Sequence, residues 1–148
     1  MKKNFVYLFA ALLLGSCSIS TDSNGKLDGF WHLTTIDTLA TGGVTDYSQR
    51  KVFWGVQAKL ISVQDKDIGH SGYYFRFKHE GDSLIINSPY LNGGHEDMPG
   101  GGDIPINDYF ELMPLGINGL EEHFVIEKLT GSHMTLRSKL LRLNFRRF

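Results

Sequence analysis

Apolar and polar residues alternate with a period of two along most of residues 29–148. In the stretch 30–38, for example, Trp31 and Leu33 fall on one face while His32 falls on the other. Such alternation is typical of β-strands that bury one face. No window of eleven or more residues shows a convincing period of 3.6, so the pattern predicts an all-β domain.

The pattern predicts seven or eight short strands, separated by turns rich in Gly, Asp and Ser. They cover residues 30–38, 51–64 (one strand bent at Gly55, or two strands), 73–79, 83–87, 124–129, 133–138 and 140–148. Strands that are apolar on one side bury that side by closing into a barrel or by stacking as a sandwich. Because closure also removes exposed sheet edges, we favour an antiparallel up-and-down barrel of about eight strands, with a β-sandwich as the alternative.

Two stretches interrupt this alternation. Residues 88–107 contain three prolines and five glycines and have no strand pattern. Loops of this length in a compact domain are usually lids, binding loops or disordered segments. The stretch 113–122 is expected to contain a short helical turn around residues 117–120.

The N-terminus has the organisation of a bacterial export signal. A basic start is followed by an apolar run over residues 5–14, which is too short for the roughly 20 residues that span a bilayer. The next four residues, Leu14-Gly15-Ser16-Cys17, resemble a lipobox. That resemblance implies cleavage of a signal peptide, residues 1–16, and attachment of fatty acids such as palmitate to Cys17. An ordinary signal peptide followed by an incidental cysteine is the alternative.

Processing at this point would leave 132 residues with a net charge of −3, enough for one domain. Cys17 is the only cysteine, so no disulfide or thiolate site would remain. Residues 17–28 are small and polar and are predicted to be a flexible tether, followed by the β domain over residues 29–148. Ser18 after the lipidated cysteine favours the outer membrane. Because Asp22 stands alone instead of in an acidic cluster, we slightly prefer a periplasm-facing position over the cell surface.

The motif Gly29-Phe30-Trp31 resembles the G-x-W motif at the first strand of lipocalins, and the tail from Met134 onward is similar to the ending of small lipocalin-like lipoproteins of the Bacteroidetes. The resemblance implies a lipocalin-like barrel in which Trp31 plugs one end and a basic residue of the last strand packs on its ring. The candidates for that cation are Arg142, Arg146 and Arg147. Most members of that lipoprotein group have no assigned function.

The aromatic residues are the richest candidate feature. Seven of them fall on predicted inward faces: Trp31, Trp54, Tyr73, Phe75, Phe77, Phe124 and Phe145. One hypothesis is that they line a pocket for a small apolar or amphipathic ligand, which makes the chain a membrane-tethered binding protein. The alternative is that the rings fill the barrel, and that the chain is an accessory or inhibitory interaction module whose protein partner is not identified.

The sequence offers little catalytic chemistry. It contains no H-E-x-x-H and no G-x-S-x-G motif. The densest set of possible metal ligands, His95-Glu96-Asp97 with Asp103 and Asp108, fits no known calcium loop. The basic C-terminal residues are best explained as a solvated strand face, and the acidic balance argues against nucleic-acid binding. We therefore expect no enzyme activity, metal or cofactor.

Overall fold

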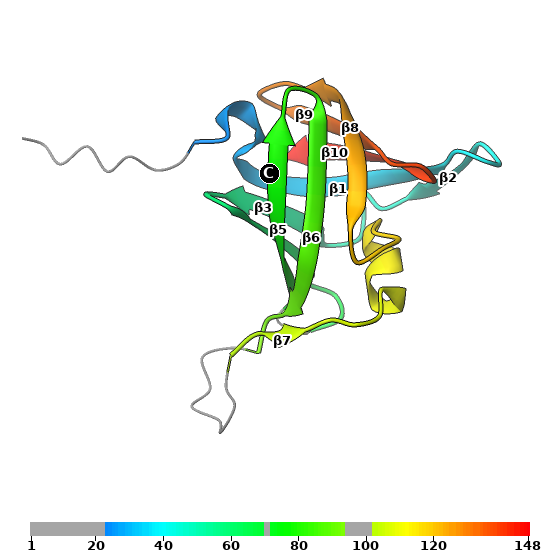
Figure 1. Ribbon diagram of the computed structural model, residues 1–148. Helices are drawn as coiled ribbons and strands as arrows, with labels where there is room; N and C mark the ends of the chain where they lie inside the picture. The colour runs from blue at the N-terminus through cyan, green and yellow to red at the C-terminus, as the bar shows by residue number, and fades with distance from the viewer. Residues whose placement is uncertain (1–22, 70–71, 94–101) are drawn as a thin grey trace, which may run out of the picture.

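The computed structural model describes residues 23–69, 72–93 and 102–148, which form a closed antiparallel barrel (Figure 1). Consecutive barrel strands pair with each other, and the last strand pairs with the first to close the ring. The eight strands are β1 (Gly29–Thr38), β3 (Val52–Gln57), β4 (Leu60–Asp65), β5 (Tyr73–Glu80), β6 (Ser83–Leu91), β8 (Glu122–Leu129), β9 (His133–Arg137) and β10 (Leu141–Arg147). The predicted up-and-down barrel is confirmed, and the sandwich alternative is wrong.

Four shorter elements complete the fold. β2 (Gly43–Asp46) pairs with the second half of β1, and β7 (Ile104–Pro105) pairs with the end of β6. The 3₁₀ segments are η2 (Gly25–Leu27) before the first strand and η3 (Phe110–Leu115) before β8. Within the described ranges, no helix has the length and apolar character needed to cross a membrane.

The barrel interior follows from the alternation in the sequence. Inward positions on neighbouring strands meet in register, as Trp31 of β1 does with Trp54 of β3 and Trp54 with Val63 of β4. Their side chains belong to one continuous apolar cluster that takes members from all eight barrel strands. Burial of this inner face is the main force that holds the barrel closed.

Both ends of the barrel are covered by apolar side chains. At one end Leu27 of η2 is fully buried, and its carbonyl accepts a hydrogen bond of 2.9 Å from Trp31 Nε1. η3 and the residues after it bring Leu112, Leu115 and Ile117 into the same core. Gly116 ends η3 at φ 88°, and a Cβ there would lie 2.7 Å from the Leu143 side chain, so only glycine fits.

Several element boundaries differ from the sequence prediction. β6 continues through Leu91 instead of ending at residue 87, because an irregularity in its pairing with β5 accommodates Ser88 and Pro89. The Pro89 carbonyl still accepts a hydrogen bond from Ile106 N–H. The 51–64 stretch is two strands that separate at residues 58–59 and not at Gly55.

Part of the segment predicted to be a flexible tether, residues 17–28, is folded. Asn24 N–H and Nδ2 donate to the Asp28 carboxylate at 2.8 and 2.6 Å, and Asn24 Nδ2 also donates to the Ala58 carbonyl. Together with the buried Leu27, these contacts make residues 24–28 part of the folded domain. The sequence did not predict that these residues are folded, because the local hydrogen bonds of short polar side chains produce no periodic pattern.

Candidate functional site

Trp31 is the plug of the barrel end at which η2 lies. The Arg147 guanidinium carbon lies 4.5 Å from the centre of the Trp31 ring, and Arg147 Nη2 donates to the Lys26 carbonyl at 2.7 Å. Of the three candidate cations, the structure places Arg147 on this ring. Arg142 and Arg146 alternate with it along β10 and lie on the outer face.

The seven candidate pocket residues all belong to one interior. Trp54 contacts two of the others, with ring centres 5.2 Å from Phe145 and 5.9 Å from Phe124. Six of the seven rings are between 0% and 3% exposed, while Phe77 is half-buried and packs against the same cluster. A void able to hold water would leave accessible surface on the side chains around it. These low exposures therefore describe rings packed against protein atoms, as in an ordinary core.

Among the described residues, three buried side-chain nitrogens have no hydrogen-bond partner: Trp54 Nε1, Asn118 Nδ2 and Arg147 Nε. Trp54 Nε1 is buried and has no hydrogen-bond acceptor among the described residues. A buried donor left unpaired costs about 1–3 kcal/mol. Trp54 is thus the one interior aromatic whose polar atom the described protein leaves unsatisfied, whereas the other tryptophan donates to Leu27.

Tyr73 connects the interior to η3. Its hydroxyl donates to Glu111 Oε2 at 2.8 Å, while its ring is buried. Burial, together with the hydrogen bond and the negative charge of Glu111, raises the pKa of Tyr73 to about 12. The phenol is therefore neutral at physiological pH and fixes η3 over this strand.

The outer wall carries a half-open hollow that the sequence did not predict. Its volume is about 330 Å³, and it is lined by Leu60, Tyr74, Phe75, Arg76, Tyr90 and Asp103. Tyr74 and Tyr90 are direct neighbours across β5 and β6. We looked for aromatic residues on inward faces and therefore did not select these outward tyrosines. The available signal was a large aromatic at the outward position of each of two paired strands.

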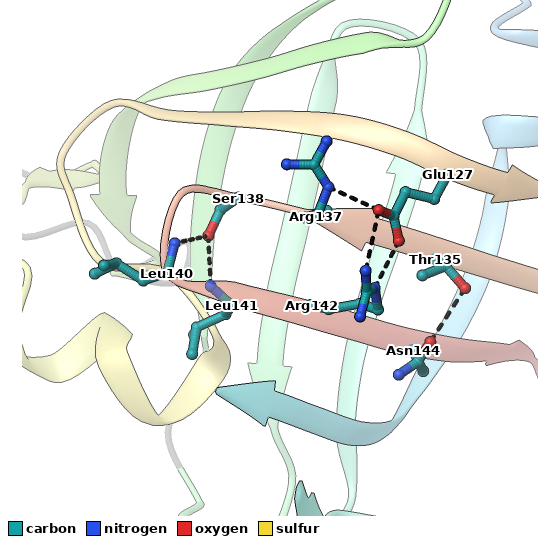
Figure 2. Close-up of polar contacts among 8 residues, drawn as sticks. All are labelled: Glu127, Thr135, Arg137, Ser138, Leu140, Leu141, Arg142 and Asn144. Atoms are coloured by element: carbon teal, nitrogen blue, oxygen red, sulfur yellow. Dashed lines mark hydrogen bonds and ion pairs between the residues drawn. The ribbon is translucent and has the colours of Figure 1, made fainter. Parts of the chain in front are cut away.

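A polar cluster covers another part of the wall, on β8, β9 and β10 (Figure 2). Glu127 occupies the extra position of a bulge in β8, and its carboxylate accepts hydrogen bonds from Arg137 Nε at 2.7 Å and Arg142 Nε at 2.6 Å. The hydrogen bond from Arg142 is the main cause that lowers the pKa of Glu127. Nearby, Asn144 accepts from Thr135 at 3.1 Å. Glu127 thus ties β8 to β9 and β10, and the hydrogen bond between Thr135 and Asn144 adds a second link between β9 and β10.

The described residues contain no group of three or more His, Cys, Asp or Glu side chains arranged to hold a metal ion. Asp103 and Asp108 are exposed in the structure. The remaining residues of that predicted ligand set, His95 to Asp97, lie outside the described residues, as does Cys17.

A family model described as a lipocalin-like domain matches residues 12–148. The chain belongs to this family. The match covers the whole barrel, including Trp31 and Arg147 at its plugged end. Among curated proteins, none matches the lipocalin-like chain.

Two solved structures resemble the lipocalin-like domain in fold. A lipocalin-like protein from Bacteroides uniformis superposes with a TM-score of 0.61 at 23% identity, covering 84% of this chain and 100% of the other. An uncharacterised protein from Bacteroides eggerthii gives 0.54 at 23% identity, covering 82% and 98%. At this level of identity the similarity concerns the fold alone.

Proposed function

We propose that this lipocalin-like domain is a membrane-tethered interaction module, in which the filled barrel is a scaffold and recognition takes place on the outer wall. The observation that carries the proposal is the packing of the interior, where six large rings are at most 3% exposed. A ligand inside would have to displace side chains that already make close-packed contacts. Binding on the outer wall does not require packed side chains to be displaced.

The hollow lined by Tyr74, Arg76 and Tyr90 is the recognition surface that we favour. Tyrosine and arginine are enriched among the residues that dominate binding energy at protein interfaces. Arg76 has no ion-pair partner among the described residues, and Asp103 on the same wall also has none, so both charges are available to a partner. An accessory or inhibitory contact with another protein fits this surface.

The tethering part of the proposal comes from the lipobox resemblance at Cys17. It implies a lipid anchor, while Ser18 favours the outer membrane and the isolated Asp22 slightly favours the periplasmic side over the cell surface. The proposal includes no enzymatic step, metal or cofactor. The Cys17→Ala variant should accumulate as an unprocessed and unlipidated precursor. Metabolic labelling with a radioactive fatty acid tests this, and a labelled variant would rule out Cys17 as the acceptor.

A second candidate function is favoured by one observation, the unpaired Trp54 Nε1. A small amphipathic ligand with a carbonyl or carboxylate oxygen would satisfy this donor if the barrel opened. The Trp54→Phe variant keeps an aromatic ring but removes the donor, so it should lose affinity for such a ligand while the fold persists.

Native mass spectrometry of the lipidated protein separates the two candidates. The interaction module should appear at the mass of the processed, acylated chain with nothing further bound. A retained small-molecule mass that the Trp54→Phe variant loses would favour the ligand-binding candidate. For the outer wall, a photo-crosslinker at position 76 in intact cells should give a protein adduct that one at Val44, exposed on β2, does not.

A further inference from the structure

Three phenylalanines form an aromatic cluster outside the barrel. The Phe30 and Phe53 rings stack with centres 4.9 Å apart, and the Phe148 ring meets both edge-on, at 6.0 and 5.2 Å. Phe53 is almost fully covered, but Phe30 is 36% exposed and Phe148 is 77% exposed. The cluster therefore has a buried base and an aromatic surface that faces solvent.

The strands hold these rings in place. Phe30 and Phe53 occupy outward positions of the paired strands β1 and β3, and Phe148 N–H donates to the Phe30 carbonyl at 2.9 Å. Next to Phe30 in the ladder stands Gly55, where a Cβ would lie 3.3 Å from the Phe30 ring and 2.7 Å from Ser62 Oγ. The missing side chain gives the Phe30 ring the room to lie flat on the wall.

Exposed cations flank the cluster. Arg146 stands opposite His32 in the β1–β10 ladder, and the His32 ring lies 5.0 Å from the Phe53 ring. Lys26 is exposed on η2, where its carbonyl accepts the hydrogen bond from Arg147. Within the described part of the chain, neither Arg146 nor Lys26 forms an ion pair with an acidic side chain. The surface is thus aromatic at its centre and positive at its rim.

Phe30 is the second residue of β1 and Phe148 directly follows β10, so the cluster lies at the end of the barrel at which η2 precedes β1. The first residue held by the fold is Asn24, through Asp28 and the Ala58 carbonyl. Seven residues from Cys17 to Asn24 span at most about 25 Å when fully extended. The ten-residue strand β1 alone is about 33 Å long. A lipid on Cys17 would keep this end of the barrel near the bilayer.

We propose that the cluster of Phe30, Phe53 and Phe148, with Arg146 and Lys26 at its rim, is the face that the domain lays on an anionic membrane leaflet. The inference rests on the proposed tethering at Cys17. Aromatic rings partition into the headgroup region of a bilayer, and cations beside them are attracted by anionic lipids. The short tether holds the face at a high effective concentration next to the lipid, so even weak contacts set its orientation.

The test uses the full lipidated protein in vesicles of phosphatidylethanolamine and phosphatidylglycerol. Since lipid blocks the only native cysteine, a cysteine introduced at Ser132 takes a single environment-sensitive fluorophore. Ser132 is exposed and accepts the backbone hydrogen bond of Arg147, so the label lies at the tether end without altering the cluster. The matched control carries the label at Val44.

We expect brominated lipids to quench the label at position 132 at least threefold more strongly than the label at position 44. The Phe148→Ser and Arg146→Glu variants should each reduce that difference by half or more, with unchanged unfolding midpoints. Equal quenching at the two positions, in protein that carries fatty acid, would overturn the membrane face. So would a Ser132→Cys variant that crosslinks into a dimer when unlabelled and shows no quenching when labelled, which would assign the cluster to a second copy. Absence of fatty acid on the chain would instead overturn the tether itself.

Discussion

Arg147 of the last strand lies over Trp31 of the first, with the guanidinium carbon 4.5 Å from the ring centre. The same guanidinium donates to the Lys26 carbonyl, 121 residues earlier in the chain. One side chain therefore joins η2, the first strand and the last strand at the plugged end of the barrel. Closure of the ring depends on this β1–β10 seam, where the two ends of the domain meet.

Replacing Arg147 by methionine should lower the free energy of unfolding by about 2 kcal/mol, because both the cation–π contact and the hydrogen bond to Lys26 are lost. Urea unfolding measures the change. The matched control is Arg146→Met on the outer face, for which we expect about 0.5 kcal/mol or less. Equal effects of the two substitutions would contradict the assignment of Arg147 to the seam.

Gly29 beside this contact should tolerate no side chain. Its φ is 137°, and a Cβ would lie 2.7 Å from Arg147 Nη1. We expect Gly29→Ala to lower the unfolding free energy by about 2 kcal/mol through backbone strain and displacement of the guanidinium. Gly131→Ala, where a Cβ meets open space, is the control and should stay within about 0.5 kcal/mol of the wild type. A neutral Gly29→Ala would show that the seam is looser than described.

The hydrogen bond of Tyr73 should make the free energy of unfolding fall at alkaline pH. The pKa of Tyr73 is raised to about 12 in the folded protein, whereas an unfolded tyrosine ionises near pH 10. The unfolded state therefore loses its proton first, and the contribution of Tyr73 to stability should decline as the pH rises from 10 to 12. The Tyr73→Phe variant should lack this decline in urea unfolding across that range. An identical pH profile in the variant would argue against the Tyr73–Glu111 contact.

The ion pairs of Glu127 should make the free energy of unfolding fall at acidic pH. Hydrogen bonds from Arg142 and Arg137 lower the pKa of Glu127, so the stabilisation is complete above its unfolded value and is lost as the pH falls through the folded one. Because the side chain is partly exposed, we expect at most about 1 kcal/mol. Unfolding of Glu127→Gln between pH 5 and pH 2 should be less pH-dependent than that of the wild type. The difference should shrink in high salt, and a salt-independent difference would contradict an ion-pair origin.

The sequence was most informative where burial imposes a period. Trp31, Trp54 and Phe145 were predicted to point inward and do so, because a one-residue slip would expose every apolar side chain of a strand. The role of Trp31 as the plug was likewise predicted, from its place in the G-x-W motif near the start of the first strand. Which of three arginines covers it was not, since that depends on the register between two strands far apart in the chain.

Other features follow from tertiary contacts that leave no periodic trace. Leu27 is part of the core because η2 folds under Trp31, although the residues next to Leu27 in the sequence are polar. β6 runs past Pro89, since an irregularity in the ladder absorbs a residue that ordinarily ends a strand. Apart from the buried Phe75, the strand residues of the outer hollow and of the Phe30 cluster occupy outward positions, and alternation alone interprets these as solvated.

The most direct test of the filled barrel uses its two tryptophans, both of which lie in the interior, as reporters. The wild-type protein is titrated with a brominated fatty acid, which quenches tryptophan fluorescence on close approach. If side chains fill the barrel, quenching should stay weak and should not saturate. Saturable quenching at one fatty acid per protein, weakened in the Trp54→Phe variant, would contradict this account and place a ligand inside the barrel.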